Sequence, residues 1–160
     1  MNQQQQASRE KYANGYYADK LEEGLQFQDV VTKALYQRGV VVVGYASRRF
    51  QTERGENMLG AEIKRDGRFR ETGNLYFETA EKAHPDRPSW TASGVRRADN
   101  SWLYVIGDEE RFWIFSVKQL QIIEKRYPPV ETPTSKGYLM PLAHADRFCL
   151  RVIDRGEGTQ

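Results

Sequence analysis

The chain has 160 residues and a formal net charge of +2 at pH 7, with 39% hydrophobic and 29% charged residues. A chain of this length suits one domain that buries roughly 70% of the surface its unfolded form would expose. The composition excludes a disordered protein, and the net charge is too small to indicate nucleic-acid binding by itself.

The first residues lack the apolar segment of a secretory leader, and no apolar run reaches the length of a transmembrane helix. We therefore expect a cytoplasmic protein with a flexible N-terminal tail (1–17), a single domain (18–155) and a C-terminal tail (156–160). Cys149 is the single cysteine, and its apolar neighbours favour a buried side chain over a nucleophile. One cysteine and two histidines also argue against a structural zinc site.

The first expected element is a helix over residues 20–38, in which apolar residues recur at helical spacing. Asp19 followed by Glu22 resembles a capping box, and Gly39 is placed to end the helix. Residues 40–46, VVVVGYA, form a β-branched run that predicts a buried strand.

Residues 47–57 are charged and irregular, and an alternating stretch follows them from residue 60 to residue 82, GAEIKRDGRFRETGNLYFETAEK. Two alternating segments around a turn signal predict a β-hairpin. Residues 83–100 contain two prolines and predict a loop with a short helix.

The C-terminal part begins with two apolar strands, 102–107 and 112–117, joined by a polar turn. A helix should follow to about residue 127, where two prolines stop it. Pro141 confines the short strand 138–142 to a sheet edge, and residues 144–153 form a short helix or strand. This order predicts an α/β fold with a mixed central sheet flanked by helices.

The predicted hairpin carries charges at alternating positions. Glu62, Lys64 and Asp66 share one face of its first strand, and Glu78 lies on the polar face of the second. If both apolar faces cover the same core, these four side chains project from one side of the hairpin. Carboxylate clusters with few histidines suit Mg²⁺ or Mn²⁺, and a cation there would polarise a phosphoryl oxygen. A solvated face with weak cross-strand ion pairs is the alternative.

Basic residues interleaved with aromatic residues crowd the middle third of the chain, a pattern compatible with contacts to nucleic-acid phosphates. A solvated surface of mixed charge is the alternative, and Asn74 also suits a turn. The candidates for nucleic-acid contacts are Arg65, Arg68, Asn74, Arg96 and Arg97.

The stretches GENMLGAEIKRD, TGNLYFETAEK, NSWLYVIGD and TSKGYLMPL resemble the PD-(D/E)XK nuclease superfamily, in particular its small phage and prophage proteins. The resemblance covers about residues 18 to 153. It implies a restriction-endonuclease-like αβββαβ core and a Mg²⁺-dependent endodeoxyribonuclease that hydrolyses DNA phosphodiester bonds in phage DNA metabolism or defence. DNA is then the expected partner, no membrane is involved, and a homodimer is an open alternative.

Two registers of the superfamily motif are open. In one, Glu62 and Lys64 form the Glu-x-Lys itself, and Glu56 replaces the preceding Asp. In the other, which we prefer, Glu62 or Asp66 is the first acid and Glu78 the second. Ala80 then stands where the superfamily places its lysine, so Lys64 would act from the neighbouring strand.

The resemblance thus implies Glu62, Lys64 and Glu78 as catalytic residues and Glu62, Asp66 and Glu78 as metal ligands. Members of the superfamily often add an acid from the first helix. Glu23 is the candidate for that position, and Glu56 is a further acid at the rim. The alanine at position 80 and the missing Pro-Asp pair leave a non-catalytic nucleic-acid-binding or regulatory protein on the same fold as the alternative. An interaction module without a nucleic-acid role is a third hypothesis.

Overall fold

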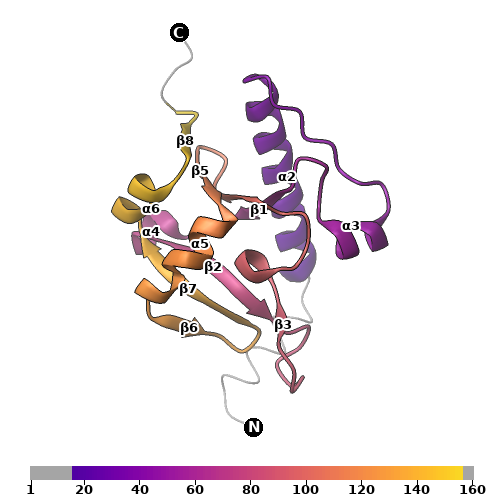
Figure 1. Ribbon diagram of the computed structural model, residues 1–160, viewed down its shortest axis with the longest axis vertical. Helices are drawn as coiled ribbons and strands as arrows, with labels where there is room; N and C mark the ends of the chain where they lie inside the picture. The colour runs from indigo at the N-terminus through magenta and orange to yellow at the C-terminus, as the bar shows by residue number, and fades with distance from the viewer. Residues whose placement is uncertain (1–15, 157–160) are drawn as a thin grey trace.

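A computed structural model describes residues 16–156, which form two four-stranded sheets with helices around them (Figure 1). The helices are α2 (Tyr16–Tyr36), α3 (Arg48–Arg54), α4 (Phe69–Thr72), α5 (Val117–Ile123) and α6 (Leu142–Phe148), with 3₁₀ turns η1 (Gly94–Arg96) and η2 (Glu124–Arg126). The strands are β1 (Ala61–Arg65), β2 (Asn74–Glu81), β3 (Thr91–Ala92), β4 (Leu103–Gly107), β5 (Arg111–Ser116), β6 (Pro129–Glu131), β7 (Ser135–Pro141) and β8 (Arg151–Asp154). Within the described range, no helix combines the length and the apolar character needed to cross a bilayer.

The two sheets differ in topology. Sheet 1 has the order β1-β4-β5-β8, in which β1 runs parallel to β4 and the other neighbours are antiparallel. Sheet 2 has the order β3-β2-β7-β6 and is antiparallel throughout. The predicted α/β class is therefore confirmed, whereas the single central sheet is wrong.

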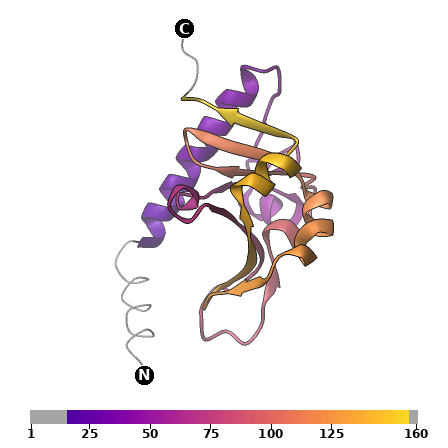
Figure 2. The same cartoon turned by 90° about the vertical axis from the view of Figure 1, so that its left-hand side faces the viewer.

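Sheet 1 is the middle layer of the fold. On one face, Val105 and Phe112 pack with Phe27 of α2 in one apolar cluster. On the other face, Tyr104 and Trp113 belong to a second cluster that includes sheet 2, α5 and α6. Figure 2 shows α2 along one side of sheet 1 and the curved sheet 2 on the other.

The first helix is confirmed, because α2 ends at Tyr36 and Gly39 follows with a φ of 80°. The capping box is wrong, since α2 already includes Tyr16 and Asp19 lies within its first turn. Of the predicted N-terminal tail, residues 1–15 lie outside the described range, as do residues 157–160 of the predicted C-terminal tail.

The predicted hairpin over residues 60–82 is wrong. β1 and β2 belong to different sheets, and α4 lies between them in the chain. The alternation itself is confirmed, because Ala61 and Ile63 face α2 while Leu75 and Phe77 face the second cluster. The two apolar sets cover different cores, so the assumption that placed the strands side by side fails.

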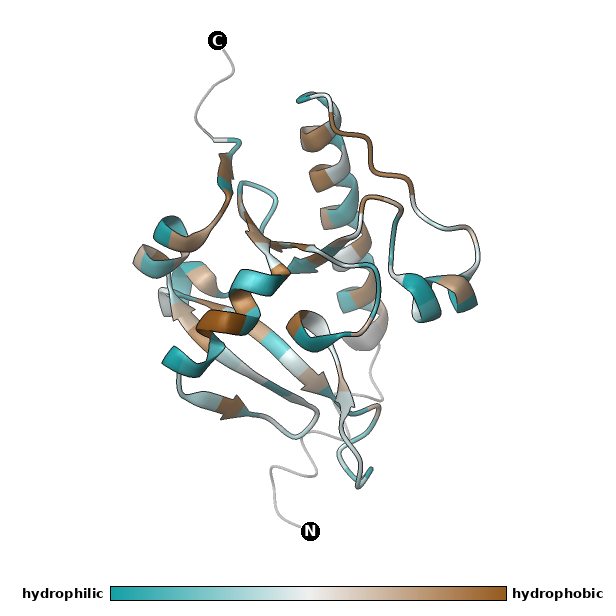
Figure 3. Cartoon of the chain, viewed as in Figure 1, coloured by the Kyte–Doolittle hydropathy of each residue, from teal (hydrophilic) through white to brown (hydrophobic). Residues whose placement is uncertain are grey.

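The predicted strand over residues 40–46 is also wrong. This segment is extended but forms a single β-bridge, between Gly44 and Asn57. Val40 and Val42 pack against the α2 cluster, whereas Val41 and Val43 are 61% and 48% exposed. Figure 3 shows this apolar segment running from α2 toward α3, a helix that the sequence did not predict.

The remaining predictions hold in outline. The apolar hairpin is β4 and β5, and Ser116 caps α5 by accepting a hydrogen bond from the Gln119 N–H at 3.4 Å. Residues 83–100 contain η1 and the two-residue strand β3. β7 is longer than expected and lies between β2 and β6, so the edge position is wrong; Pro141 ends the strand. The last segment forms both a helix, α6, and a strand, β8.

Close packing between β2 and β7 yields a stability prediction. A Cβ atom at Gly137 would clash with the backbone carbonyl oxygen of Phe77, whereas a Cβ at Gly24 in α2 meets no atom within 4 Å. We expect Gly137→Ala to lower the free energy of unfolding by about 1–3 kcal/mol, because buried backbone must shift. Gly24→Ala should raise it by about 0.5–1 kcal/mol through helix propensity. Urea unfolding of both variants measures the difference, and equal effects would contradict the packing.

Candidate functional site: a charged cluster between the sheets

Charged side chains from both sheets meet next to the second apolar cluster. Glu62 and Lys64 alternate with the residues of β1 that face α2, so they point to the opposite side, toward sheet 2. Glu78 of β2, Glu56 of the loop before β1, and Arg97 of the loop after η1 interact with them electrostatically. These five residues are called the Glu62 cluster below.

Glu62 is the most buried member of the cluster, with 1% of its surface exposed. Its carboxylate forms ion pairs with Lys64 Nζ at 2.8 Å and Arg97 Nη1 at 3.6 Å. Neither carboxylate oxygen accepts a well-directed hydrogen bond from any described residue. The two oxygens of such a buried carboxylate can still accept hydrogen bonds or coordinate a cation.

Glu78 is held by two hydroxyl groups. Ser93 Oγ donates to Glu78 Oε1 at 2.6 Å, and Ser135 Oγ donates to Oε2 at 2.7 Å. Tyr76 OH is 2.7 Å from Ser135 Oγ, which extends the network by one more hydroxyl. The pairing of β2 with β7 shifts register between Glu78 and Ala80. Such a bulge bends the strand and re-aims its side chains, which explains how Glu78 reaches the cluster.

Glu56 has a strongly perturbed carboxyl group. Burial and the neighbouring Glu62 carboxylate raise the pKa of Glu56 to about 7, against the opposing effects of Lys64 and Arg97. Its Oε2 also accepts a hydrogen bond from the Ile63 N–H at 3.4 Å, at the free edge of β1. A carboxyl group that titrates near neutral pH can accept or donate a proton under physiological conditions.

Lys64 stays protonated. Burial lowers the pKa of its ammonium group, but the carboxylates of Glu62, Glu56 and Glu78 together raise that pKa above its ordinary value. Tyr104, which lies opposite Glu62 in the β1–β4 register, has a raised pKa because it is buried and because the same carboxylates disfavour a phenolate. The cluster thus presents a fixed positive charge and a neutral phenol beside several acids.

Arg97 was not expected in the cluster, and neither was its ion-pair partner Asp99 beside it. Arg97 Nε forms an ion pair with Asp99 Oδ2 at 2.9 Å, and its Nη2 donates to the Gln51 carbonyl oxygen at 2.8 Å. The sequence pattern favours phosphate contacts for Arg97 and gives no signal for Asp99. No alternation pattern marks either residue, since both lie in a loop that only the fold brings to β1.

Two of the predicted acids lie elsewhere. Asp66 follows the end of β1, and its carboxylate accepts hydrogen bonds from the Arg68 and Tyr76 N–H groups at 2.9 and 3.0 Å. It therefore ties the end of β1 to β2 through the backbone. Glu23 forms ion pairs with Lys20 and with Arg65, which faces the α2 side of β1. The structure brings Glu62, Lys64, Glu78 and Glu56 together, but not Asp66 or Glu23.

Most residues predicted to contact nucleic acid have protein partners. Arg65 pairs with Glu109 and Glu23, and Arg96 pairs with Glu124 at 2.8 Å. The Asn74 side chain donates to the Thr72 carbonyl oxygen, which supports the turn interpretation. Arg68 is exposed. The role of these residues in nucleic-acid binding stays a prediction.

The described residues contain no group of three or more His, Cys, Asp or Glu side chains arranged to hold a metal ion. Mg²⁺ does not require such a group, because it keeps several waters and is often held by one or two carboxylates together with substrate phosphates. The unused acceptor capacity of the Glu62 carboxylate fits that mode of binding. Glu62 and Glu78 are the carboxylates that would hold the ion.

Comparisons with protein-family models, curated proteins and solved structures found no match to this chain. The resemblance to PD-(D/E)XK nucleases therefore stays a prediction from the quoted motifs.

The raised pKa of Glu56 predicts a pH-dependent stability. Because that pKa rises from 4.5 in the unfolded chain to about 7 in the folded protein, the folded protein binds more protons between these values. The free energy of unfolding should then fall as pH rises through this window. Glu56→Gln removes the effect, so the variant should exceed wild type by on the order of 1–3 kcal/mol at pH 8 and match it near pH 4.

Urea unfolding in the presence of a chelator measures this difference without bound divalent cations. Glu53→Gln is the matched control, because Glu53 lies on exposed α3 and pairs only with Arg49 in the structure described. A Glu56→Gln effect that is the same at both pH values would contradict the assignment.

Proposed function

We propose that this protein is a Mg²⁺-dependent endodeoxyribonuclease and that the Glu62 cluster is its active site. The convergence of Glu62 and Glu78 on Lys64, from two different sheets, is the observation that carries the proposal. The resemblance to PD-(D/E)XK nucleases implies two acids and a lysine at the active site. The acids come from β1 and β2, the strands of the preferred register, with Lys64 on the strand of the first acid. The superfamily places its acids on adjacent strands, whereas β1 and β2 belong to different sheets.

Each member of the cluster has a chemical role in this proposal. Glu62 and Glu78 would hold the cation, which would supply Lewis-acid polarisation of a phosphoryl oxygen and make a water molecule easier to deprotonate. Ser93 and Ser135 keep the Glu78 carboxylate in one orientation. Lys64, which remains protonated, stabilises negative charge that develops on the phosphate. Glu56 titrates near neutral pH and accepts the proton of the attacking water.

A non-catalytic nucleic-acid-binding or regulatory protein on the same fold is the second candidate. It is favoured by the ion pairs of the cluster, because Lys64 and Arg97 already neutralise Glu62 without a metal ion. The alanine at position 80 also departs from the superfamily pattern. Under this candidate the cluster stabilises the contact between the two sheets and performs no reaction.

The decisive experiment compares Mn²⁺ binding and DNA cleavage in three variants. Glu62→Gln and Glu78→Gln should each weaken calorimetric Mn²⁺ binding at least about tenfold and lower Mg²⁺-dependent cleavage about 100-fold or more. Glu23→Gln should leave both unchanged, because Glu23 lies on the α2 side of sheet 1. Circular dichroism of all three variants checks that each one is folded.

The two candidates give different results. Mn²⁺ binding that is lost in both cluster variants, together with cleavage by wild type, supports the nuclease. Wild type that binds DNA in a chelator but neither binds Mn²⁺ nor cleaves DNA supports the non-catalytic protein. Equal cleavage by wild type and Glu78→Gln would overturn the proposed active site.

A further inference from the structure

An aromatic stack leads from the core to the surface at η2 and α6. Tyr138 of β7 stacks on Phe77 with ring centroids 5.3 Å apart, and Tyr127 stacks on Tyr138 at 5.5 Å and an interplanar angle of 9°. The Tyr127 hydroxyl group lies 3.1 Å from Nδ1 of the exposed His144 in α6. The stack gives the rings at the surface a rigid base in the core.

Cationic side chains surround the outer end of this stack. The guanidinium groups of Arg126 and Arg147 lie 5.7 and 5.8 Å from the centroid of the Phe148 ring. Phe148 also contacts His144 edge-on at 6.2 Å. Two guanidinium groups at one aromatic ring concentrate positive charge at this end of the stack, and that charge attracts an anion. The η2–α6 surface comprises Lys125, Arg126, Tyr127, His144, Arg147 and Phe148.

The acids near this surface are already paired with cations from other elements. Glu124 pairs with Arg96 at 2.8 Å, and Asp146 pairs with Arg111 at 2.9 Å. Glu131 pairs with a lysine of β7 at 3.1 Å. Within residues 16–156, no carboxylate forms an ion pair with Lys125, Arg126 or Arg147. Their charge is available to a partner.

A pocket of about 610 Å³ adjoins the surface, and it is lined by Lys125, Tyr127 and Tyr138 together with Glu124 and Glu131, two acids that are already in ion pairs. Small-molecule sites typically have volumes of roughly 300–1,000 Å³. Aromatic rings and an open pocket beside cations without ion-pair partners are elements with which proteins hold unpaired bases and their phosphates.

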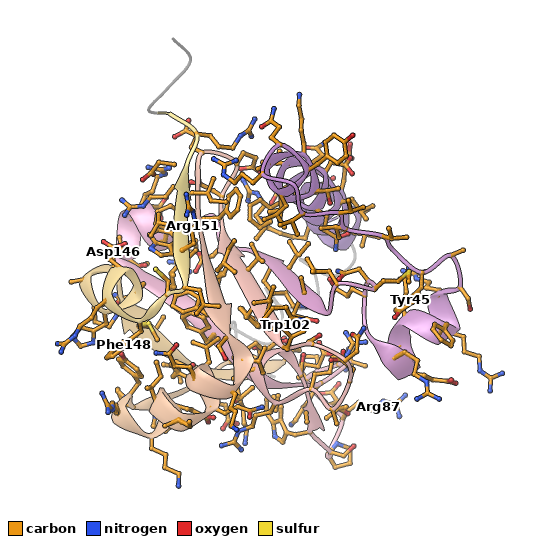
Figure 4. The ribbon with its side chains drawn as sticks, turned by 45° about the horizontal axis from the view of Figure 1, so that its top comes forward. Tyr45, Arg87, Trp102, Asp146, Phe148 and Arg151 are labelled. Carbon is orange, nitrogen blue, oxygen red and sulfur yellow. The ribbon has the colours of Figure 1, made fainter. Side chains whose placement is uncertain are left out.

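The η1 turn joins this surface to the Glu62 cluster. Arg96 pairs with Glu124, the residue just before Lys125, while its neighbour Arg97 pairs with Glu62. Two consecutive residues therefore contact both regions. Figure 4 places Phe148 and Arg151 on one side of the molecule and Tyr45, near α3, on the opposite side.

We propose that the η2–α6 surface binds single-stranded DNA, with phosphates at Arg126 and Arg147 and bases against the aromatic rings and the pocket. The inference rests on the proposed function for the choice of DNA, and it specifies the form of the substrate. A duplex offers its phosphates but no free base faces, so it would leave the rings and the pocket unused. The arginines predicted from the middle third of the chain are less suited, since most of them form ion pairs.

The test measures binding of a fluorescent single-stranded oligonucleotide to the full chain in a chelator, across a series of salt concentrations. Arg126→Glu/Arg147→Glu should weaken binding by about tenfold or more near 0.1 M salt. The log–log salt slope should fall by about 1.4, because each lost phosphate contact removes about 0.7. Arg48→Glu/Arg54→Glu on exposed α3 makes the same charge change and should alter affinity less than threefold. Tyr127→Leu should weaken binding without changing the salt slope.

The outcomes separate this inference from the proposed function. If both charge-reversal variants lose the same amount of oligonucleotide affinity, the effect is general electrostatics, and the η2–α6 surface is not the binding site. Tighter binding to a duplex, or to vesicles of anionic lipid, than to the single strand would overturn the assigned partner. Glu23→Gln, which lies outside both regions, should bind the oligonucleotide like wild type. If wild type binds the strand through the η2–α6 surface but neither binds Mn²⁺ nor cleaves DNA, the inference about this surface holds and the nuclease proposal fails.

Discussion

Strands β4 and β5 carry apolar side chains on both faces, and the arrangement of the other layers follows from that constraint. A sheet that is apolar on both sides is stable only when both sides are covered. Helix α2 covers one face of sheet 1, and sheet 2 with α5 and α6 covers the other. Strand β1 joins this sheet at its edge, parallel to β4, and therefore lies between the same two layers.

The burial of Glu62 is a consequence of that position. Ala61 and Ile63 of β1 face α2, but the opposite side of the strand holds Glu62, which sheet 2 then encloses. A buried carboxylate is costly unless cations and donors compensate it, and removal of one partner leaves an unpaired charge. Lys64 and Arg97 supply the positive charge here, although neither satisfies the carboxylate oxygens with directed hydrogen bonds. A costly arrangement of this kind at the contact between two sheets is typical of a functional site.

The positive charges of the protein divide into two groups with different roles. Arg65, Arg96 and Arg97 pair with carboxylates and join elements that are distant in the chain. The arginines beside Phe148 have no such partner within the described structure. Net charge does not reveal this division, because it counts paired and unpaired side chains alike. The local balance of charge decides which surface attracts a polyanion.

The local structure of most elements could be predicted from the sequence, and so could the face on which each β1 and β2 side chain lies. Helical spacing located α2, apolar runs located β4 and β5, and alternation separated Glu62 from Ile63 and Glu78 from Phe77. These features depend on the periods of helices and strands, which neighbouring residues express directly. The extended segment after α2 was misassigned, because a β-branched run does not specify a pairing partner.

Which strands pair and which acids lie together depends on the tertiary structure. β1 and β2 are close in the chain, yet they enter different sheets because their apolar faces complete different cores. Asp66 lies beyond the end of β1, where its carboxylate accepts hydrogen bonds from two backbone N–H groups. The bulge in β2 and the loop after η1 then brought Glu78 and Arg97 to Glu62. Contacts of this kind depend on packing between segments that are distant in the chain, and a single sequence carries no local signal of them.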